Sequence, residues 1–316
     1  MTQLKPSRNL TFGLLFFTAL ILAAALPVRI YQQLCLIEAS GFWRRAETTQ
    51  ILLYVLIAVL IVIPVACAYF TRGSAALDLT RRRRIPEGIA ALFAAFAMAA
   101  DAVTAGLLAA DMLQTLAMGA GRGGQSQMIF RSGAAAAATE AVCAVCGALL
   151  FFSLAMINFF PKKHFFLRRL LLLTPVLWAA SGMLRRFART INYLRVSDLF
   201  LGVITLAALT LFFLYFAQLL GGVSDEGRAA RLFGAGIPAA VLCLLCFVPR
   251  AAAMFGGIAL SQDAALDLWA LALPVFILIL LAGRLFSAVP QLNEATAKIT
   301  QEHQEHQEHT EKSEEA

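Results

Sequence analysis

Long apolar stretches recur about eight times along the first 290 residues, and they constrain this chain more than any other feature of its sequence. Each stretch has about 15 to 25 residues, with arginine, lysine or proline at its ends. A helix needs about 20 apolar residues to cross the hydrocarbon layer of a membrane, which is about 30 Å thick. The sequence therefore predicts a polytopic integral membrane protein.

The composition supports a helical bundle. Hydrophobic residues make up 60% of the 316 and charged residues only 14%, whereas a soluble domain has about 25% charged residues. The apolar stretches lack the alternation of strands, so their backbone groups must be satisfied within helices. We predict an all-α bundle of about eight transmembrane helices that forms one domain over residues 1–290.

The fifth expected span is the shortest. Between Arg169 and Arg185 lie 15 residues, or about 22 Å of helix, so the flanking arginines must reach outward to the headgroups. If this segment does not span, the chain has seven spans and its C-terminus changes sides. Small residues along the third span predict close packing and a central position for that helix. The eight expected spans are residues 10–30, 51–70, 88–112, 134–158, 165–184, 198–221, 232–249 and 266–286.

The distribution of positive charge predicts the orientation. With eight spans and the N-terminus inside, and leaving out the two lysines of the C-terminal tail, 14 lysines and arginines fall on the inner side and 10 on the outer side, as the positive-inside rule favours. We therefore expect a multi-pass protein of the cell membrane with both termini in the cytoplasm. Residues 291–316 carry seven glutamates against two lysines, which predicts an acidic, low-complexity and disordered tail.

Four consecutive arginines precede the third span, namely Arg81, Arg82, Arg83 and Arg84. Each basic residue near an anionic membrane surface contributes about 1 kcal/mol to binding, so this run predicts headgroup contacts and a fixed topology. The basic excess of the chain lies at the ends of apolar spans, where such side chains meet lipid. We expect membrane lipids as partners and no nucleic acid.

The carboxylates inside apolar spans are the costliest residues. Asp101 lies in the third span, where a charged residue costs about 2.5 to 3.5 kcal/mol, and Glu140 lies one turn inside the fourth. The expected topology puts both in the outer half of the membrane, where Arg185 and Arg250 end the fifth and seventh spans. These four residues are the candidate binding site for a solute or ion. The alternative is an ion pair or a protonated acid that only fixes helix packing.

Two C-x-x-C pairs form a second candidate site. Cys143 and Cys146 lie in the fourth span, Cys243 and Cys246 in the seventh, and the two pairs are expected at comparable depth. Paired thiols can exchange disulfides, and four thiolates can bind a metal. Both pairs lack neighbours that would activate a thiol, so the alternative is that these cysteines act as small hydrophobic residues.

The sequence carries no other catalytic signature. The chain has no H-E-x-x-H motif, no phosphate-binding glycine loop and no paired catalytic aspartates. Three of its four histidines, His303, His306 and His309, stand in the tail, where a solvated repeat is the simpler interpretation than a loose metal site. We assign no catalytic residue, no cofactor and no metal ligand.

Residues 29–43, between the first two expected spans, include the sequences RIYQ and IEASGFW. This stretch of about fifteen residues resembles one in uncharacterised multi-pass membrane proteins of anaerobic Gram-positive bacteria. The resemblance implies a bacterial cell membrane and no known activity. Tyr31, Phe42 and Trp43 have the character of interfacial aromatic residues.

Three classes of function remain. The leading hypothesis is a transporter or permease-like protein for a small solute or ion, with Asp101 and Glu140 as the residues to test. The second is a non-transporting membrane component, such as a sensor, scaffold or assembly partner. The third is a membrane thiol–disulfide oxidoreductase that uses the paired cysteines.

Overall fold

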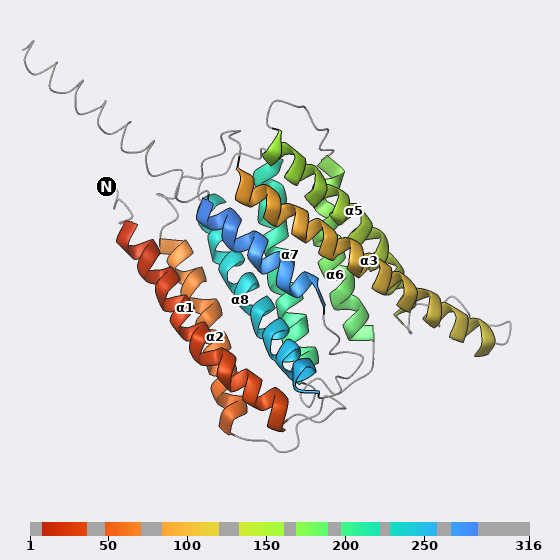
Figure 1. The fold of residues 1–316 in the computed structure, drawn as a ribbon, viewed down its shortest axis with the longest axis horizontal. Helices are drawn as coiled ribbons and strands as arrows, with labels where there is room; N and C mark the ends of the chain where they lie inside the picture. The colour runs from red at the N-terminus through yellow and green to blue at the C-terminus, as the bar shows by residue number, and fades with distance from the viewer. Residues whose placement is uncertain are drawn as a thin grey trace, which may run out of the picture.

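The protein is a bundle of helices, as the sequence predicts (Figure 1). The computed structural model describes residues 8–36, 48–70, 84–119, 133–160, 169–188, 197–221, 228–257 and 267–283, and these ranges contain no strand. The short turns η1 (Gln32–Leu36) and η2 (Arg169–Leu173) follow α1 and precede α6. The α-helices of the described ranges are α1 (Arg8–Tyr31), α2 (Thr48–Phe70), α3 (Ile85–Gly119), α5 (Ala134–Phe159), α6 (Thr174–Ala188), α7 (Ser197–Leu220), α8 (Arg228–Phe255) and the helix Trp269–Gly283.

Each of the eight expected spans coincides with one of these helices. Six of them are long and apolar enough to cross a membrane, and the two others have shorter apolar helical stretches, Gln50–Ala66 in α2 and the helix Trp269–Gly283. The fifth expected span belongs to the six, because η2 and α6 give a continuous, predominantly apolar helical stretch of 18 residues over Leu170–Phe187. Its Pro175 stands at the second position of α6, where the missing N–H of proline costs no helical hydrogen bond.

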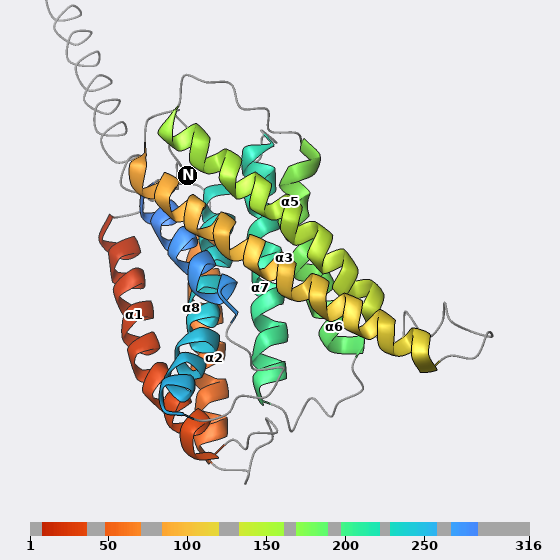
Figure 2. The ribbon, with the colours of Figure 1, turned by 45° about the vertical axis from the view of Figure 1, so that its right-hand side comes forward.

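The helices α3 and α5 form a closely packed antiparallel pair that is inclined to the rest of the bundle (Figures 1 and 2). Small residues allow the close approach: a Cβ atom at Gly88 would lie 2.7 Å from Phe159, and one at Gly147 would lie 2.8 Å from Met98. The third expected span ends at residue 112, but α3 continues to Gly119. Its last turns extend beyond α5, so its C-terminal end projects from the bundle.

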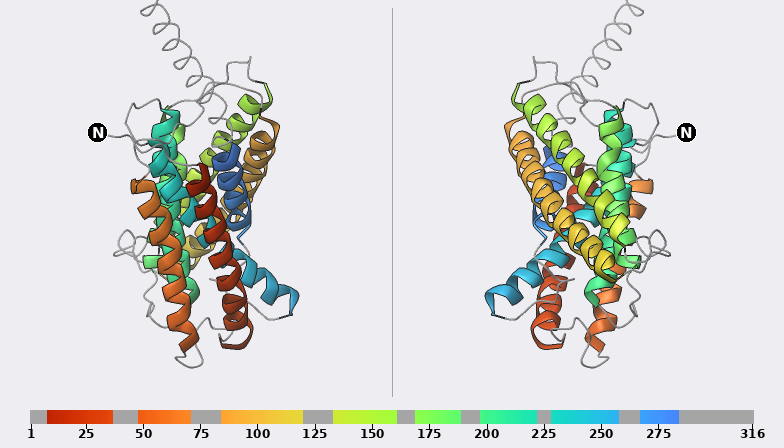
Figure 3. Two further views of the ribbon diagram at one scale, coloured as in Figure 1. Left: turned by 90° about the vertical axis from the view of Figure 1, so that its left-hand side faces the viewer. Right: turned by 90° about the vertical axis from the view of Figure 1, so that its right-hand side faces the viewer.

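The central helix is α8, and the prediction of a central third span is wrong. Within their apolar windows, 72% of α8 is buried but only 39% of α3. α8 contacts α1, α2 and α7, whereas α3 packs mainly on α5, also approaches the helix Trp269–Gly283 at Glu87, and exposes its remaining face. Small residues along α3 allow its close approach to α5 without placing α3 at the centre of the bundle. α8 contains Pro238 and Pro249, and its C-terminal end bends away from the bundle (Figure 3).

Several expectations concern residues that lie outside the described ranges. These are Arg81, Arg82 and Arg83, the interfacial Phe42 and Trp43, and the acidic tail of residues 291–316. The fourth arginine of the run, Arg84, is described. Its Nη1 atom donates a 2.9 Å hydrogen bond to Oε1 of Glu87, in the first turn of α3, where a carboxylate also favours the helix dipole. Arg84 thus forms an ion pair at the start of α3.

Candidate functional site

Glu140 and Arg185 meet in a bidentate ion pair that joins α5 to α6. Nε of Arg185 donates to Oε2 of Glu140 at 2.5 Å, and Nη2 donates to Oε1 at 3.1 Å. The Glu140 side chain is only 3% exposed and that of Arg185 18%. Two parallel charge-assisted hydrogen bonds hold both side chains in a defined geometry and compensate much of the cost of burying the carboxylate.

Asp101 has a different partner, the indole of Trp178. Nε1 of Trp178, on α6, donates a 2.7 Å hydrogen bond to Oδ2 of Asp101 near the middle of α3. Trp178 is 1% exposed and also meets Trp269 edge to face, with ring centroids 5.3 Å apart. The indole satisfies one acceptor position of the carboxyl group but brings no positive charge.

Asp267, which precedes the helix Trp269–Gly283, lies between two arginines. Its Oδ2 atom is 3.7 Å from Nη2 of Arg186 and 3.7 Å from Nη1 of Arg250. The arginine side chains are 12% and 6% exposed and that of Asp267 is 25% exposed. One carboxylate therefore links the C-terminal parts of α6 and α8 to the start of the last described helix.

Together these six charged residues form what we call the charge cluster, defined as Asp101, Glu140, Arg185, Arg186, Arg250 and Asp267. It holds three acids and three arginines, and among the described residues Asp101 is its one acid without an ion pair. Asp101 is within electrostatic reach of Glu140, Arg185 and Asp267. Because Gly106 of α3 faces Ala141 of α5, Asp101 lies about five residues, or about 7 Å of helix, deeper than Glu140.

Two glycines make room for the cluster. A Cβ atom at Gly182 of α6 would lie 3.0 Å from Oε1 of Glu140, so glycine lets the carboxylate approach the helix closely. A Cβ atom at Gly202 of α7 would lie 3.4 Å from Nε of Arg186. Helix α7 thus also lines the cluster.

The structure brings all four sequence candidates into one region. Sequence reasoning missed Trp178, Arg186 and Asp267. In the sequence Asp267 looks like an ordinary loop residue. Its one signal is that it precedes the eighth expected span, on the side of the membrane where the predicted topology also places Arg186 and Arg250. Trp178 gives no such signal, because a tryptophan in an apolar helix resembles any other core residue.

The cysteine pairs lie on α5 and α8. Cys143, Cys243 and Cys246 are buried and Cys146 is half-buried, and all four are free thiols. Sγ of Cys246 shares a 3.3 Å hydrogen bond with Oγ1 of Thr205. Within the described ranges, no group of three or more histidine, cysteine, aspartate or glutamate side chains is placed to hold a metal ion. The redox function stays a prediction.

Comparison with known proteins gives no relative. No family model matches the chain, and neither curated proteins nor solved structures give a match. What the sequence and the fold support directly is a multi-pass helical membrane protein with a buried charge cluster.

Proposed function

We propose that the protein is a transporter or permease-like protein for a small solute or ion, and that the charge cluster is its binding site. The single observation that carries this proposal is Asp101. A carboxylate at its depth requires a countercharge or a proton, and its hydrogen-bond partner in the described residues is a neutral indole. A proton or a bound cation supplies the missing compensation.

The neighbouring ion pairs support the same proposal. A small solute that carries positive and negative groups can replace one arginine and one carboxylate as partners without leaving a buried charge uncompensated. Asp267 is the most exposed acid of the cluster, and its Oδ2 atom is 3.7 Å from a guanidinium nitrogen of Arg186 and of Arg250. Its ion pairs are therefore the ones that a solute separates most easily. Proline residues inside α2 and α8 favour bending of these helices.

A second candidate is a non-transporting membrane component in which the cluster only holds helices together. The bidentate pair between Glu140 and Arg185 favours it, because such a pair fixes α5 against α6 whether or not a ligand binds. In that case Asp101 and Trp178 are a packing contact between α3 and α6.

The test is the thermal stability of the purified protein against a panel of ions, amino acids and sugars over a range of pH. It is run beside Asp101→Asn and a matched control, Asp111→Asn, which changes an exposed aspartate on the same helix. A ligand at 100 times its Kd adds about 2.7 kcal/mol to the free energy of unfolding. We expect at least one ligand that stabilises the parent and Asp111→Asn but not Asp101→Asn.

A ligand found in this way is then followed by uptake into proteoliposomes, where Asp101→Asn should abolish accumulation. Ligand binding without uptake favours a sensor. Equal responses of the parent and of Asp101→Asn to every stabilising ligand contradict the proposed site.

A further inference from the structure

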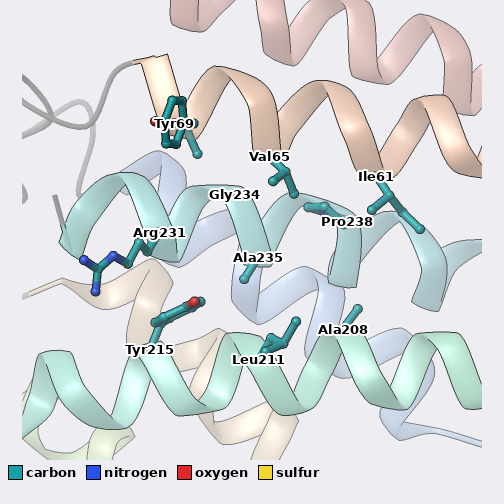
Figure 4. A pocket seen from close by; sticks show the side chains of 11 residues that line it. Ile61, Val65, Tyr69, Ala208, Leu211, Tyr215, Arg231, Gly234, Ala235 and Pro238 are labelled. Carbon is teal, nitrogen blue, oxygen red and sulfur yellow. The ribbon is translucent and has the colours of Figure 1, made fainter.

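A groove lies between α2, α7 and the N-terminal part of α8 (Figure 4). Arg250 of the charge cluster lies near the C-terminal end of the same helix. Its volume is about 360 Å³, within the size range of pockets that hold small molecules. The groove is open on one side, since Val65 is 49% exposed and Leu211 51%. The lining residues are Ile61, Val65, Ala68 and Tyr69 from α2, Ala208, Leu211 and Tyr215 from α7, and Arg231, Gly234, Ala235 and Pro238 from α8.

The lining changes character along the groove. At one end stand the guanidinium group of Arg231 and the phenol rings of Tyr69 and Tyr215, and the remaining lining is apolar (Figure 4). Tyr69 is the second-last residue of α2 and Arg231 is in the first turn of α8, so the polar end coincides with the helix ends. A cationic side chain at one end of an apolar groove matches the negatively charged headgroup and the acyl chain of an anionic phospholipid.

The spacing of two arginines on α8 fixes the depth of the polar end. Arg231 and Arg250 are 19 residues apart, or about 28 Å of helix, which is close to the ~30 Å thickness of the hydrocarbon layer. If Arg250 and the charge cluster stand near one surface, Arg231 stands at the other. Tyr69 and Tyr215 then occupy the interface, where tyrosines concentrate in membrane proteins.

Small residues shape the groove. Gly234 lets α8 approach α2 closely, since a Cβ atom there would come within 2.7 Å of Ala68, while Ala208 and Ala235 leave space between α7 and α8. Larger side chains at Ala208 and Ala235 would fill the trough. The groove is therefore a built feature of the contact between three helices.

We propose that this groove binds one anionic phospholipid, with its phosphate at Arg231 and an acyl chain along the apolar trough. The occupant comes from the leaflet opposite the charge cluster. Under the predicted topology that is the cytoplasmic leaflet. The site is independent of the proposed transport function.

The test measures lipid retained by the purified protein in native mass spectrometry after delipidation and addition of phosphatidylglycerol or phosphatidylcholine. We expect one phosphatidylglycerol bound in preference to phosphatidylcholine. Arg231→Gln should lower that preference about fivefold, which corresponds to about 1 kcal/mol for one basic residue at the membrane surface. Ala208→Trp fills the trough and should lower retention of both lipids at least tenfold.

Two controls separate the groove from general effects. Val142→Trp places the same side chain at a position of α5 that is 64% exposed and outside the groove, and it should retain lipid as the parent does. Ala235→Leu is a second, smaller groove-filling change in case Ala208→Trp does not fold. Inorganic phosphate added in excess should not displace the lipid, because phosphate lacks the acyl chain.

Four results overturn the proposal. The first is an unchanged lipid preference in Arg231→Gln. The second is parental retention in both folded groove-filling variants, and the third is loss of lipid in Val142→Trp as large as in Ala208→Trp. The fourth is displacement by inorganic phosphate, because the site would then recognise a free anion.

Discussion

Glu140 and Asp101 are two buried carboxyl groups of the same cluster, and their surroundings differ. Glu140 receives two hydrogen bonds from the guanidinium group of Arg185, whereas Asp101 receives one from the indole of Trp178. Both partners belong to α6, seven residues apart. The charge of Glu140 is therefore compensated by Arg185, whereas Asp101 has a hydrogen-bond partner that carries no charge.

This difference separates a structural role from a functional one. A buried ion pair loses most when one partner is removed, because the remaining charge is left without compensation. A carboxyl group whose partner is neutral loses little on conversion to an amide, because the amide oxygen accepts the same hydrogen bond. Stability should therefore depend on Glu140 more than on Asp101, and ligand binding the other way round.

The largest expected effect is that of Glu140→Gln. It leaves Arg185 buried without its carboxylate and should lower the free energy of unfolding by about 3 kcal/mol. Asp101→Asn, the matched change, should cost less than about 1 kcal/mol. Chemical unfolding in mixed micelles measures both values. Equal losses would mean that Asp101 also depends on a positive partner.

A smaller effect is expected from Gly182→Ala, which places a methyl group 3.0 Å from the Glu140 carboxylate. We expect a loss of about 1–3 kcal/mol from overpacking, measured by the same unfolding experiment. Gly106→Ala is the control, because its Cβ atom would meet only Ala141 at 4.0 Å. That change should be neutral or stabilising, as alanine favours a helix over glycine by about 0.5–1 kcal/mol. Equal effects of the two substitutions would show that the carboxylate does not need the space.

The smallest expected effect is the coupling between Asp101 and Trp178. A double-mutant cycle with Asp101→Asn and Trp178→Phe should give a coupling energy of about 1 kcal/mol or less, as for most polar contacts between membrane helices. A coupling energy of about 1.5–3 kcal/mol is typical of a hydrogen bond to a charged group. That result would show that Asp101 carries its charge in the resting protein.

The sequence predicts the helices well because length and apolar composition alone decide which segments can cross a membrane. It also predicts that costly carboxylates lie near Arg185 and Arg250, since buried charges require partners. It does not predict which partner each acid takes. That choice depends on the inclination of α3 and α5 to the bundle and on the close approach that Gly182 allows. Nor does the sequence predict that α8, and not α3, is the more buried helix.

The length of α3 has a consequence for Asp101. Its 35 residues make a rod of about 52 Å, while the hydrocarbon layer is about 30 Å thick, and its C-terminal turns project from the bundle. Asp101 stands 18 residues before the last residue of that rod, Gly119. About 27 Å of continuous helix therefore separates Asp101 from the projecting end, so a partner that binds that end contacts the same helix that carries the buried acid.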